Sequence, residues 1–301
     1  MVDEQDDYDI FLQTWEPSER LIQASLPQNL SDPFSRQRLF ADSTAGAAVD
    51  RTVFVRGPKM MEAEERAARC YDFFEANREK WVAEFRDYAL SKGVPTAKLD
   101  SYNTSFARDW VDGLKRRQDS SEMLAIKASV RDYDRKCYPT LEDRYVINSV
   151  DPSIQPLFTP QEMAAIFQAN YGLIEALLPD YVDHLGNEGP GALSDLYVRR
   201  GVYMPSIEDV RRELHYLSSY SLSIGPVEQF AQTWTPSTEG RGISSIFSAP
   251  LPAIQERVVA FAPFVEGMSL SQLEFVVAPP VEHTPLQDDG EFGGIREFSF
   301  S

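Results

Sequence analysis

Apolar side chains recur at helical spacing through much of the first half of the chain. Between residues 59 and 92, large apolar side chains fall on one helix face, a proline precedes the segment and a glycine follows it. The same spacing predicts a second helix over residues 104–117 and a third that starts after Ser120 and reaches Cys137. Three successive amphipathic helices joined by short polar turns are typical of an antiparallel helical bundle.

The third quarter of the chain begins with helical signals as well. Thr159 and Glu162 form a capping box around a first-turn proline, which predicts the start of a helix. Because proline disrupts a helix interior, we expect this helix to end before Pro179. A short helix is expected at residues 193–199, and Ser206 is a candidate N-cap for another.

From residue 220 onwards the pattern shifts to the alternation of apolar and polar residues that is typical of strands. Residues 266–271 separate two β-rich segments and predict a hairpin. Short strands with abundant proline, serine and glycine favour a small antiparallel sheet. We therefore predict an α+β protein, with a helical N-terminal bundle and a small antiparallel β-sheet towards the C-terminus. The predicted strands lie at residues 220–224, 257–265, 272–277 and 297–300.

Composition divides the chain into three parts. Residues 1–57 hold 10 acidic and 5 basic side chains, and their apolar residues follow no period, so we expect an extended arm. This arm packs either on its own domain or on a neighbouring subunit. Residues 58–150 form the predicted helical bundle domain, and residues 151–301 form an acidic α+β domain without lysine. The boundary near residue 150 is either a linker or a long loop.

Acidic residues dominate the second half of the chain. No lysine follows Lys136 in the remaining 165 residues, which carry 22 acidic side chains and 8 arginines. The net charge of −18 repels nucleic-acid backbones and anionic membranes, so neither is an expected partner. Base composition, adaptation to salt and selection against modifiable lysines are alternative origins of this bias.

Signals for export and for membrane insertion are missing from the sequence. The first residues lack a basic and apolar leader, and no window holds the roughly 18 apolar residues of a membrane span. We therefore expect a location in the cytoplasm or in an assembled particle such as a virion. Two cysteines are too few for a disulfide framework, and the helical pattern around Cys70 and Cys137 favours buried thiols.

Catalytic and metal-binding motifs do not emerge from the sequence. The three histidines lack the spacing of a zinc site, and the carboxylates at 288–291 lack the remaining ligands of a calcium loop. No cofactor or metal is therefore predicted. His184, which follows acidic residues ahead of a glycine-rich loop, is the best-placed candidate for a general base. His215 is the other histidine considered for that role.

Two function hypotheses follow from these patterns. The first is a non-enzymatic structural or interaction subunit of a larger assembly, for example a component of a virion or another multi-subunit shell. Such a subunit would engage protein partners, or further copies of itself, through the N-terminal arm and exposed aromatic residues. Packing within the chain's own loops is the alternative role of these aromatics. The candidate interface residues are Trp15, Phe34, Trp234, Phe247 and Phe264.

The second hypothesis is an enzyme without a familiar motif. It would be a hydrolase or an effector-type modifying enzyme in which a histidine acts with nearby carboxylates. The assembly hypothesis predicts a stable oligomer or partner complex. The enzyme hypothesis predicts that replacing His184 by alanine changes turnover.

Overall fold

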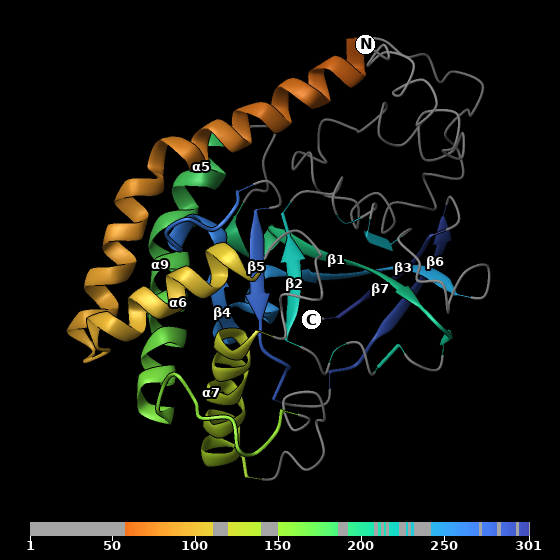
Figure 1. Cartoon of the computed structure of the whole chain (residues 1–301). Helices are drawn as coiled ribbons and strands as arrows, with labels where there is room; N and C mark the ends of the chain where they lie inside the picture. The colour runs from red at the N-terminus through yellow and green to blue at the C-terminus, as the bar shows by residue number, and fades with distance from the viewer. Residues whose placement is uncertain are drawn as a thin grey trace, which may run out of the picture.

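The computed structural model has an α+β fold, which confirms the predicted fold class (Figure 1). In its described part, α-helices between residues 58 and 185 pack beside a sheet that is built from residues 197–299. The side chains of residues 58–70, 195 and 291–292 are not described. The described residues are 58–110, 120–139, 150–185 and 192–300, the last range with gaps at 208–209, 212–213, 215–216, 223–226, 228–229, 232–241, 271–272, 282–283 and 293–294.

The described α-helices are α5 (Pro58–Ser91), α6 (Thr96–Arg108), α7 (Ser121–Cys137) and α9 (Pro160–Leu185). Two of them start at the predicted capping residues. The hydroxyl oxygen of Ser120 accepts a hydrogen bond from the backbone N–H of Met123 at 3.2 Å, which caps α7. At the start of α9, the side chains of Thr159 and Glu162 each accept from the other residue's backbone N–H, at 3.3 and 2.7 Å. None of the described helices is long and apolar enough to cross a membrane.

Helix α6 lies earlier in the chain than the predicted segment 104–117. Its buried stripe consists of Leu99, Tyr102 and Phe106, so the helix already presents an apolar face before residue 104. The backbone N–H of Asp109, its C-cap, donates to the carbonyl of Ser105 at 2.8 Å, and the helix ends there. Trp110, which the apolar pattern assigned to this helix, lies after its C-terminus.

Helix α9 runs through Pro179 to Leu185, contrary to the expected end before this proline. Proline in a helix interior costs about 3 kcal/mol because it removes a hydrogen bond and crowds the preceding turn. Leu178, Tyr181 and Val182 are nevertheless buried in the core on either side of it. Burial of each large apolar side chain contributes about 1.5–3 kcal/mol, which together outweighs the effect of the proline.

The strands are β1 (Tyr197–Met204), β2 (Ser218–Ser221), β3 (Ile243–Pro250), β4 (Val258–Phe261), β5 (Glu274–Val277), β6 (Gln287–Phe292) and β7 (Ile295–Ser299). They form one seven-stranded sheet in the order β4-β5-β2-β1-β3-β7-β6. β3 and β7 pair in parallel, while the other neighbours are antiparallel, so the sheet is mixed and larger than the small antiparallel sheet predicted. Figure 1 shows a strong twist, with β5 and β2 running across the direction of β1 and β7.

The strands agree with prediction in part. β2, β4, β5 and β7 lie within or beside predicted strands, and β4 pairs with β5 as the expected antiparallel neighbour. β1 lies where a short helix was expected at residues 193–199, of which only a 3-10 turn at Leu193–Asp195 forms. β3 and β6 have no predicted counterpart. The helix expected after Ser206 falls largely outside the described residues.

One hydrophobic core joins the helices to the sheet. Phe74 of α5 lies 5.9 Å from Phe261 of β4 between ring centroids, and Trp81 of α5 lies 5.8 Å from Phe264. Residues of α6, α7 and α9 belong to the same cluster of buried side chains. The helices therefore pack on the sheet as well as on one another, which differs from a separate N-terminal bundle. The domain boundary at residue 150 stays a prediction.

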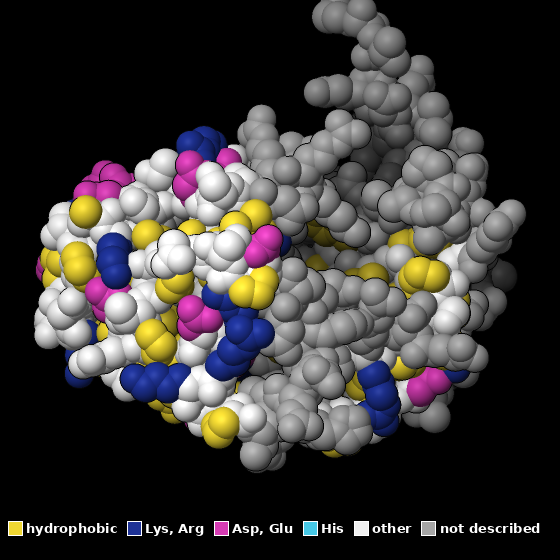
Figure 2. All heavy atoms as spheres, turned by 60° about the horizontal axis from the view of Figure 1, so that its bottom comes forward, with side chains coloured by type: hydrophobic (Ala, Val, Ile, Leu, Met, Phe, Trp, Pro, Cys, Tyr) yellow, Lys and Arg dark blue, Asp and Glu magenta, His cyan; other side chains and the backbone are white. Residues whose placement is uncertain are grey.

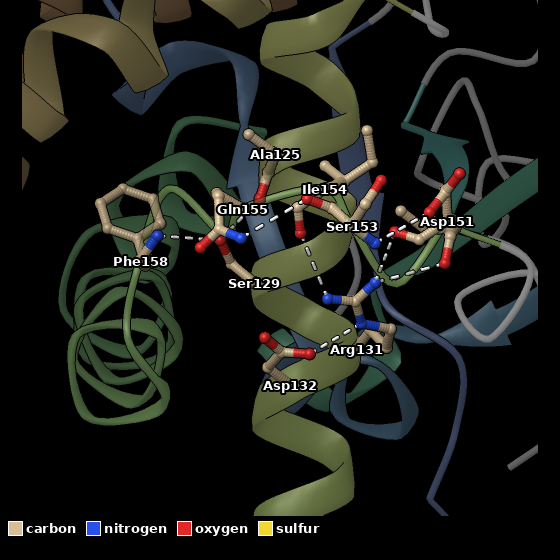
Figure 3. Close-up of polar contacts among 10 residues, drawn as sticks. Ala125, Ser129, Arg131, Asp132, Asp151, Ser153, Ile154, Gln155 and Phe158 are labelled. Carbon is tan, nitrogen blue, oxygen red and sulfur yellow. Dashed lines mark hydrogen bonds and ion pairs between the residues drawn. The ribbon is translucent and has the colours of Figure 1, made fainter.

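A buried arginine of α7 holds residues 150–154, which precede α9 (Figure 3). Nη1 of Arg131 donates to the carbonyl oxygens of Val150 and Asp151, at 3.2 Å each. Nη2 donates to the carbonyl of Ile154 at 3.5 Å, and Nε donates to the Asp132 carboxylate at 2.7 Å. Because the guanidinium satisfies several loop carbonyls at once, Arg131 fixes how the chain enters α9.

Candidate functional site

A row of polar side chains crosses the sheet from strand to strand. Glu274 of β5 lies opposite Ser221 of β2, Ser221 lies opposite Arg199 of β1, and Arg199 lies opposite Ser248 of β3. Ser248 in turn lies opposite Ser299 of β7. Directly opposed residues on neighbouring strands point to the same face of a sheet, so these five side chains share one face. We call them the polar row.

The polar row faces away from the helix-covered core. Residues next in sequence to its members belong to the main hydrophobic core, and successive side chains on a strand point to opposite faces. The core neighbours are Val198, Tyr220, Phe247 and Phe275. The two faces of the sheet therefore differ in kind: one is apolar and packs on the helices, and the other carries the polar row.

The charged members of the polar row are buried. The exposed fraction is 1% for Arg199 and 5% for Glu274, and it is 6% for Ser221 and 0% for Ser248. Moving a charge out of water costs several kcal/mol, which opposite charges and hydrogen bonds offset only in favourable geometry. Because apolar residues of similar size would carry no such penalty, buried charges in a sheet point to a role other than stability.

Two further polar side chains lie on the face of the polar row. Ser219 precedes Ser221 by two residues on β2, and Glu297 precedes Ser299 by two residues on β7, so both point to the same side. The hydroxyl of Ser248 donates a hydrogen bond to a carboxylate oxygen of Glu297, which is fully buried. Arg199 thus has a serine on each neighbouring strand and a glutamate beyond each serine.

The indole of Trp110 reaches the β5 end of the polar row. Its Nε1–H donates to a carboxylate oxygen of Glu274 at 2.6 Å and to the hydroxyl oxygen of Ser219 at 3.2 Å. Trp110 follows the C-terminus of α6, and its side chain is buried. A residue from the helical half therefore contributes to this face of the sheet.

The backbone is strained immediately before Glu274. Leu273 has a φ of 44°, and it is the single residue other than glycine with a positive φ in the described part of the chain. Such a conformation costs of order 1–3 kcal/mol and persists only where surrounding contacts impose it. Leu273 is fully buried, and its carbonyl accepts from the backbone N–H of Leu222 at 3.4 Å. Strain of this kind is concentrated at functional sites.

A close backbone contact lies beside Arg199 on the same face. A Cβ atom at Gly201 would lie 1.8 Å from the carbonyl oxygen of Val227 and 2.7 Å from the backbone nitrogen of Ala231. Only glycine permits this approach, so Gly201 allows the backbone of Val227 and of Ala231 to lie against β1. Val227 and Ala231 form a second small apolar cluster with Ile246 of β3 and Ile295 of β7.

The side chains of this site suit the binding and conversion of an anionic ligand. An arginine presents a planar fork of N–H donors to phosphate or carboxylate groups. A glutamate accepts or delivers a proton, and it stabilises positive charge on a reacting group. Among the described residues no group of three or more potential metal ligands is found. Of the residues named here, Arg199 is the one suited to the anionic part of a cofactor.

An ion pair with little exposed surface joins Arg257 to Asp134 of α7. Arg257 donates to the carboxylate of Asp134 at 2.8 Å and to the carbonyl of Pro279 at 2.9 Å, and its guanidinium lies 5.2 Å from the ring centre of Phe167. Burial raises the pKa of the nearby Tyr133 hydroxyl above its ordinary range. The pocket beside Arg257 has room for about one water molecule, so this pair joins α7 to the sheet rather than forming a ligand site.

Three of the predicted site residues, His184, Phe247 and Phe264, lie among the described residues, and none of them belongs to the polar row. His184 lies exposed near the end of α9, with its ring centre 4.8 Å from that of Phe73. Phe247 and Phe264 have no exposed surface and belong to the core, so the expectation that these two rings are exposed is wrong. Their strands and turns pack them inside the chain, which was the alternative role considered for them. Trp15, Phe34, Trp234 and His215 lie outside the described residues.

Other sequence expectations can be placed as well. The thiol of Cys137 is exposed at the end of α7, contrary to the expected burial, because the stripe ends before the last turn. The acidic segment at 288–291 lies in β6, where Asp288 forms an ion pair with Arg296 of β7. Basic and acidic side chains are interspersed on the described part of the face in Figure 2, so charge of one sign marks no site there.

Comparison of the chain with protein-family models, with curated proteins and with solved structures finds no match. The polar row also has little signal in the sequence, because its members come from five strands and lie close together only through strand pairing. One usable signal was the glutamate within each of two predicted strands, Glu274 and Glu297. A carboxylate that interrupts a strand pattern indicates a buried charge once the strand is known to be central.

Proposed function

We propose that this protein is an enzyme of the group-transfer or hydrolase class and that the polar row is its active site. The observation that carries the proposal is the burial of Arg199 and Glu274, which have opposite charge, on one face of the sheet on either side of Ser221. Buried charged groups are concentrated at functional sites. The strained backbone at Leu273 beside Glu274 supports the same assignment.

Arg199 supports binding of a phosphate-bearing substrate. Its guanidinium stays charged at all physiological pH values and matches the oxygens of phosphate with two parallel hydrogen bonds. Ser221 and Ser248 lie opposite Arg199 on the two neighbouring strands, so polar side chains flank the guanidinium on both sides. Phosphate groups of a nucleotide or a phosphorylated sugar are therefore the proposed ligand of Arg199.

Glu274 supports reaction at a carbon that develops positive charge. Cleavage of a glycosidic bond passes through an oxocarbenium-like state, which a carboxylate stabilises. In the proposed step the bond between the sugar carbon and its leaving group breaks, and the electron pair departs with the leaving group. Water or an acceptor group then bonds to that carbon and gives its proton to the Glu274 carboxylate. A glycosyl donor that carries phosphate would bind Arg199 through its phosphate and react beside Glu274.

Access to the polar row requires movement, because its charged side chains are almost completely enclosed. Closure that excludes water strengthens electrostatic interactions within a site, and many enzymes open and close on the microsecond to millisecond scale. We therefore expect substrate to bind a form of the protein in which the face of the polar row is open.

The experiment uses two probes that carry a diphosphate and a glycosidic bond, UDP-glucose and NAD⁺. Release of glucose or nicotinamide is measured for the wild type and for two substitutions. Glu274→Gln keeps the shape of the side chain but removes its charge, and we expect kcat to fall roughly 10²–10⁴-fold. Arg199→Lys keeps the charge but removes the fork, and we expect KM to rise about 10- to 100-fold.

Two controls make this experiment decisive. Inorganic pyrophosphate carries the anionic groups without a glycosidic bond, so it should compete with the probes and should lose affinity in Arg199→Lys. His184→Ala should leave kcat and KM unchanged, because His184 lies exposed outside the polar row. Thermal unfolding curves show whether each variant is folded. Retention of wild-type turnover by folded Glu274→Gln, or turnover of neither probe by the wild type, would refute the proposed function.

A structural or interaction subunit remains the second candidate function. The observation that favours it is the length of α5, which spans 34 residues, and Figure 1 shows its first turns running beyond the other described helices and strands. A projecting helix offers a surface to a protein partner or to a second copy of the chain. This candidate also retains the proposed roles of residues 1–57 and of Trp15, Phe34 and Trp234.

Light scattering coupled to size-exclusion chromatography tests this second candidate. The chain is run at low and at molar salt over a range of concentrations, with and without residues 1–57. A discrete oligomer that is lost on deletion supports assembly through the N-terminal segment. A monomer under every condition rules out self-assembly and leaves only a protein partner for this candidate.

A further inference from the structure

We infer that Trp110 is a positioning residue that holds the carboxylate of Glu274 in place in the polar row. The inference rests on the proposed function for its consequence in turnover, whereas the contact itself can be tested without any substrate. The first step is geometric: the indole Nε1–H lies 2.6 Å from the carboxylate oxygen and 3.2 Å from the hydroxyl oxygen of Ser219. One donor therefore joins two side chains of β2 and β5.

The chemistry of the indole makes this contact directional. An indole N–H donates and cannot accept, so both Glu274 and Ser219 must present an acceptor to it. In Glu274 the acceptor is one of the two carboxylate oxygens, so the contact fixes the direction in which the carboxylate points. Because the Ser219 oxygen is used as an acceptor, its own O–H proton stays available for another partner on the same face.

Trp110 is itself held firmly. Its backbone N–H donates to the carbonyl of Ser105 at 3.3 Å, and its ring centre lies 5.9 Å from that of Phe106. Ser105 and Phe106 are residues of α6. The preceding residue, Asp109, accepts a hydrogen bond at 2.7 Å from the hydroxyl of Ser120, which is also the cap of α7. The end of α6 and the start of α7 are thus joined next to the indole, which suits a positioning role rather than a mobile one.

The chain contains a matched control for Trp110. Trp81 is buried to a similar degree in the same core, but its indole nitrogen has no hydrogen-bond partner among the described residues. Replacing either tryptophan by phenylalanine removes an N–H and part of a ring. Only the change at Trp110 also removes the hydrogen bonds to Glu274 and Ser219, so the difference between the two variants isolates the contacts of this N–H.

The first measurement is the indole N–H signal in ¹H–¹⁵N spectra of the full chain. Loss of one signal in Trp110→Phe, and of another in Trp81→Phe, assigns both. We expect Glu274→Gln to shift the Trp110 signal and to leave the Trp81 signal in place. An unshifted Trp110 signal in folded Glu274→Gln overturns the inference, whether or not the protein turns over either probe.

The second measurement is turnover of the probe that the wild type converts. We expect Trp110→Phe to lower kcat about 10- to 100-fold with KM unchanged, because a displaced carboxylate affects the reacting state more than binding. Trp81→Phe should leave kcat and KM within about twofold. Equal kcat values for the two variants would overturn the inference. Absence of turnover in the wild type instead refutes the proposed function, and the indole signal then decides alone whether Trp110 holds Glu274.

Discussion

The indole N–H of Trp110 donates to the carboxylate of Glu274 at 2.6 Å, although 164 residues separate them in the chain. Trp110 follows the C-terminus of α6, and Glu274 is the first residue of β5. Among the described residues, buried charges of both signs occur on one strand face, that of the polar row. The contact links this face to the helices. The stability of the scaffold around it can be tested at four places.

Replacement of Arg131 by methionine should destabilise the protein by about 3 kcal/mol. The variant keeps the apolar stem but removes the donors that bind the carbonyls of Val150, Asp151 and Ile154. The free energy of unfolding is measured in urea. Lys136→Ala, at an exposed site on the same helix, is the control and should change that free energy by less than about 0.5 kcal/mol. Equal effects of the two substitutions would contradict the structural role of Arg131.

Gly201→Ala should lower the free energy of unfolding by about 3 kcal/mol or more. The added Cβ would lie 1.8 Å from the backbone oxygen of Val227, and a backbone atom cannot rotate away as a flexible side chain can. Gly172→Ala on α9 is the matched control, because its nearest neighbours are atoms of Tyr88 at 4.0 Å. That control should stabilise the protein by about 0.5–1 kcal/mol, since alanine is the better helix former. A stable Gly201→Ala variant would show that β1 does not pack against Val227 and Ala231 as described.

Asp134→Ala should cost about 3–5 kcal/mol, because it leaves the charge of Arg257 buried without its carboxylate. Combining it with Arg257→Met removes the orphaned charge and fills the space with an apolar chain, so most of the lost stability should return. The four proteins form a double-mutant cycle that is followed by thermal or urea unfolding. Additive losses in the double variant would mean that the two side chains do not act as a pair.

Asp288 provides a small and predictable dependence of stability on pH. The hydrogen bond from Arg296 holds the pKa of the Asp288 carboxyl below its ordinary value of 3.8. A lowered folded-state pKa adds stability that is present above pH 3.8 and is lost as the pH falls through the folded value. Because the pair is largely exposed, Asp288→Asn should cost less than about 1 kcal/mol at pH 7. The difference from the wild type should shrink as the pH falls below 3.8, and a difference that grows on acidification would contradict this assignment.

Local sequence signals predicted several elements well. The start of α7 at the Ser120 cap and the start of α9 at its Thr159–Glu162 capping box depend on residues within one turn of the helix end. The antiparallel pairing of β4 with β5 was likewise predicted from two β-rich segments that follow one another in the chain, although β4 ends at Phe261 and β5 begins at Glu274, farther apart than the predicted turn at 266–271. Such features can be predicted because the interacting groups are close together in the chain.

Other elements were decided by packing at long range. α9 continues through Pro179 because both sides of that residue are buried against distant parts of the core. β1 includes residues 197–199, where a short helix was expected, and its pairing with β2 and β3 makes a strand there favourable.

The amino-acid sequence alone therefore determined the α+β class, the caps of two helices and the positions of the strands whose side chains alternate. The polar row was decided by tertiary structure alone. Its serines, Arg199 and Glu274 are ordinary polar residues in the sequence, and strand register brings them onto one buried face. Register depends on contacts between distant segments, and a shift by one residue would turn each side chain to the opposite face of the sheet.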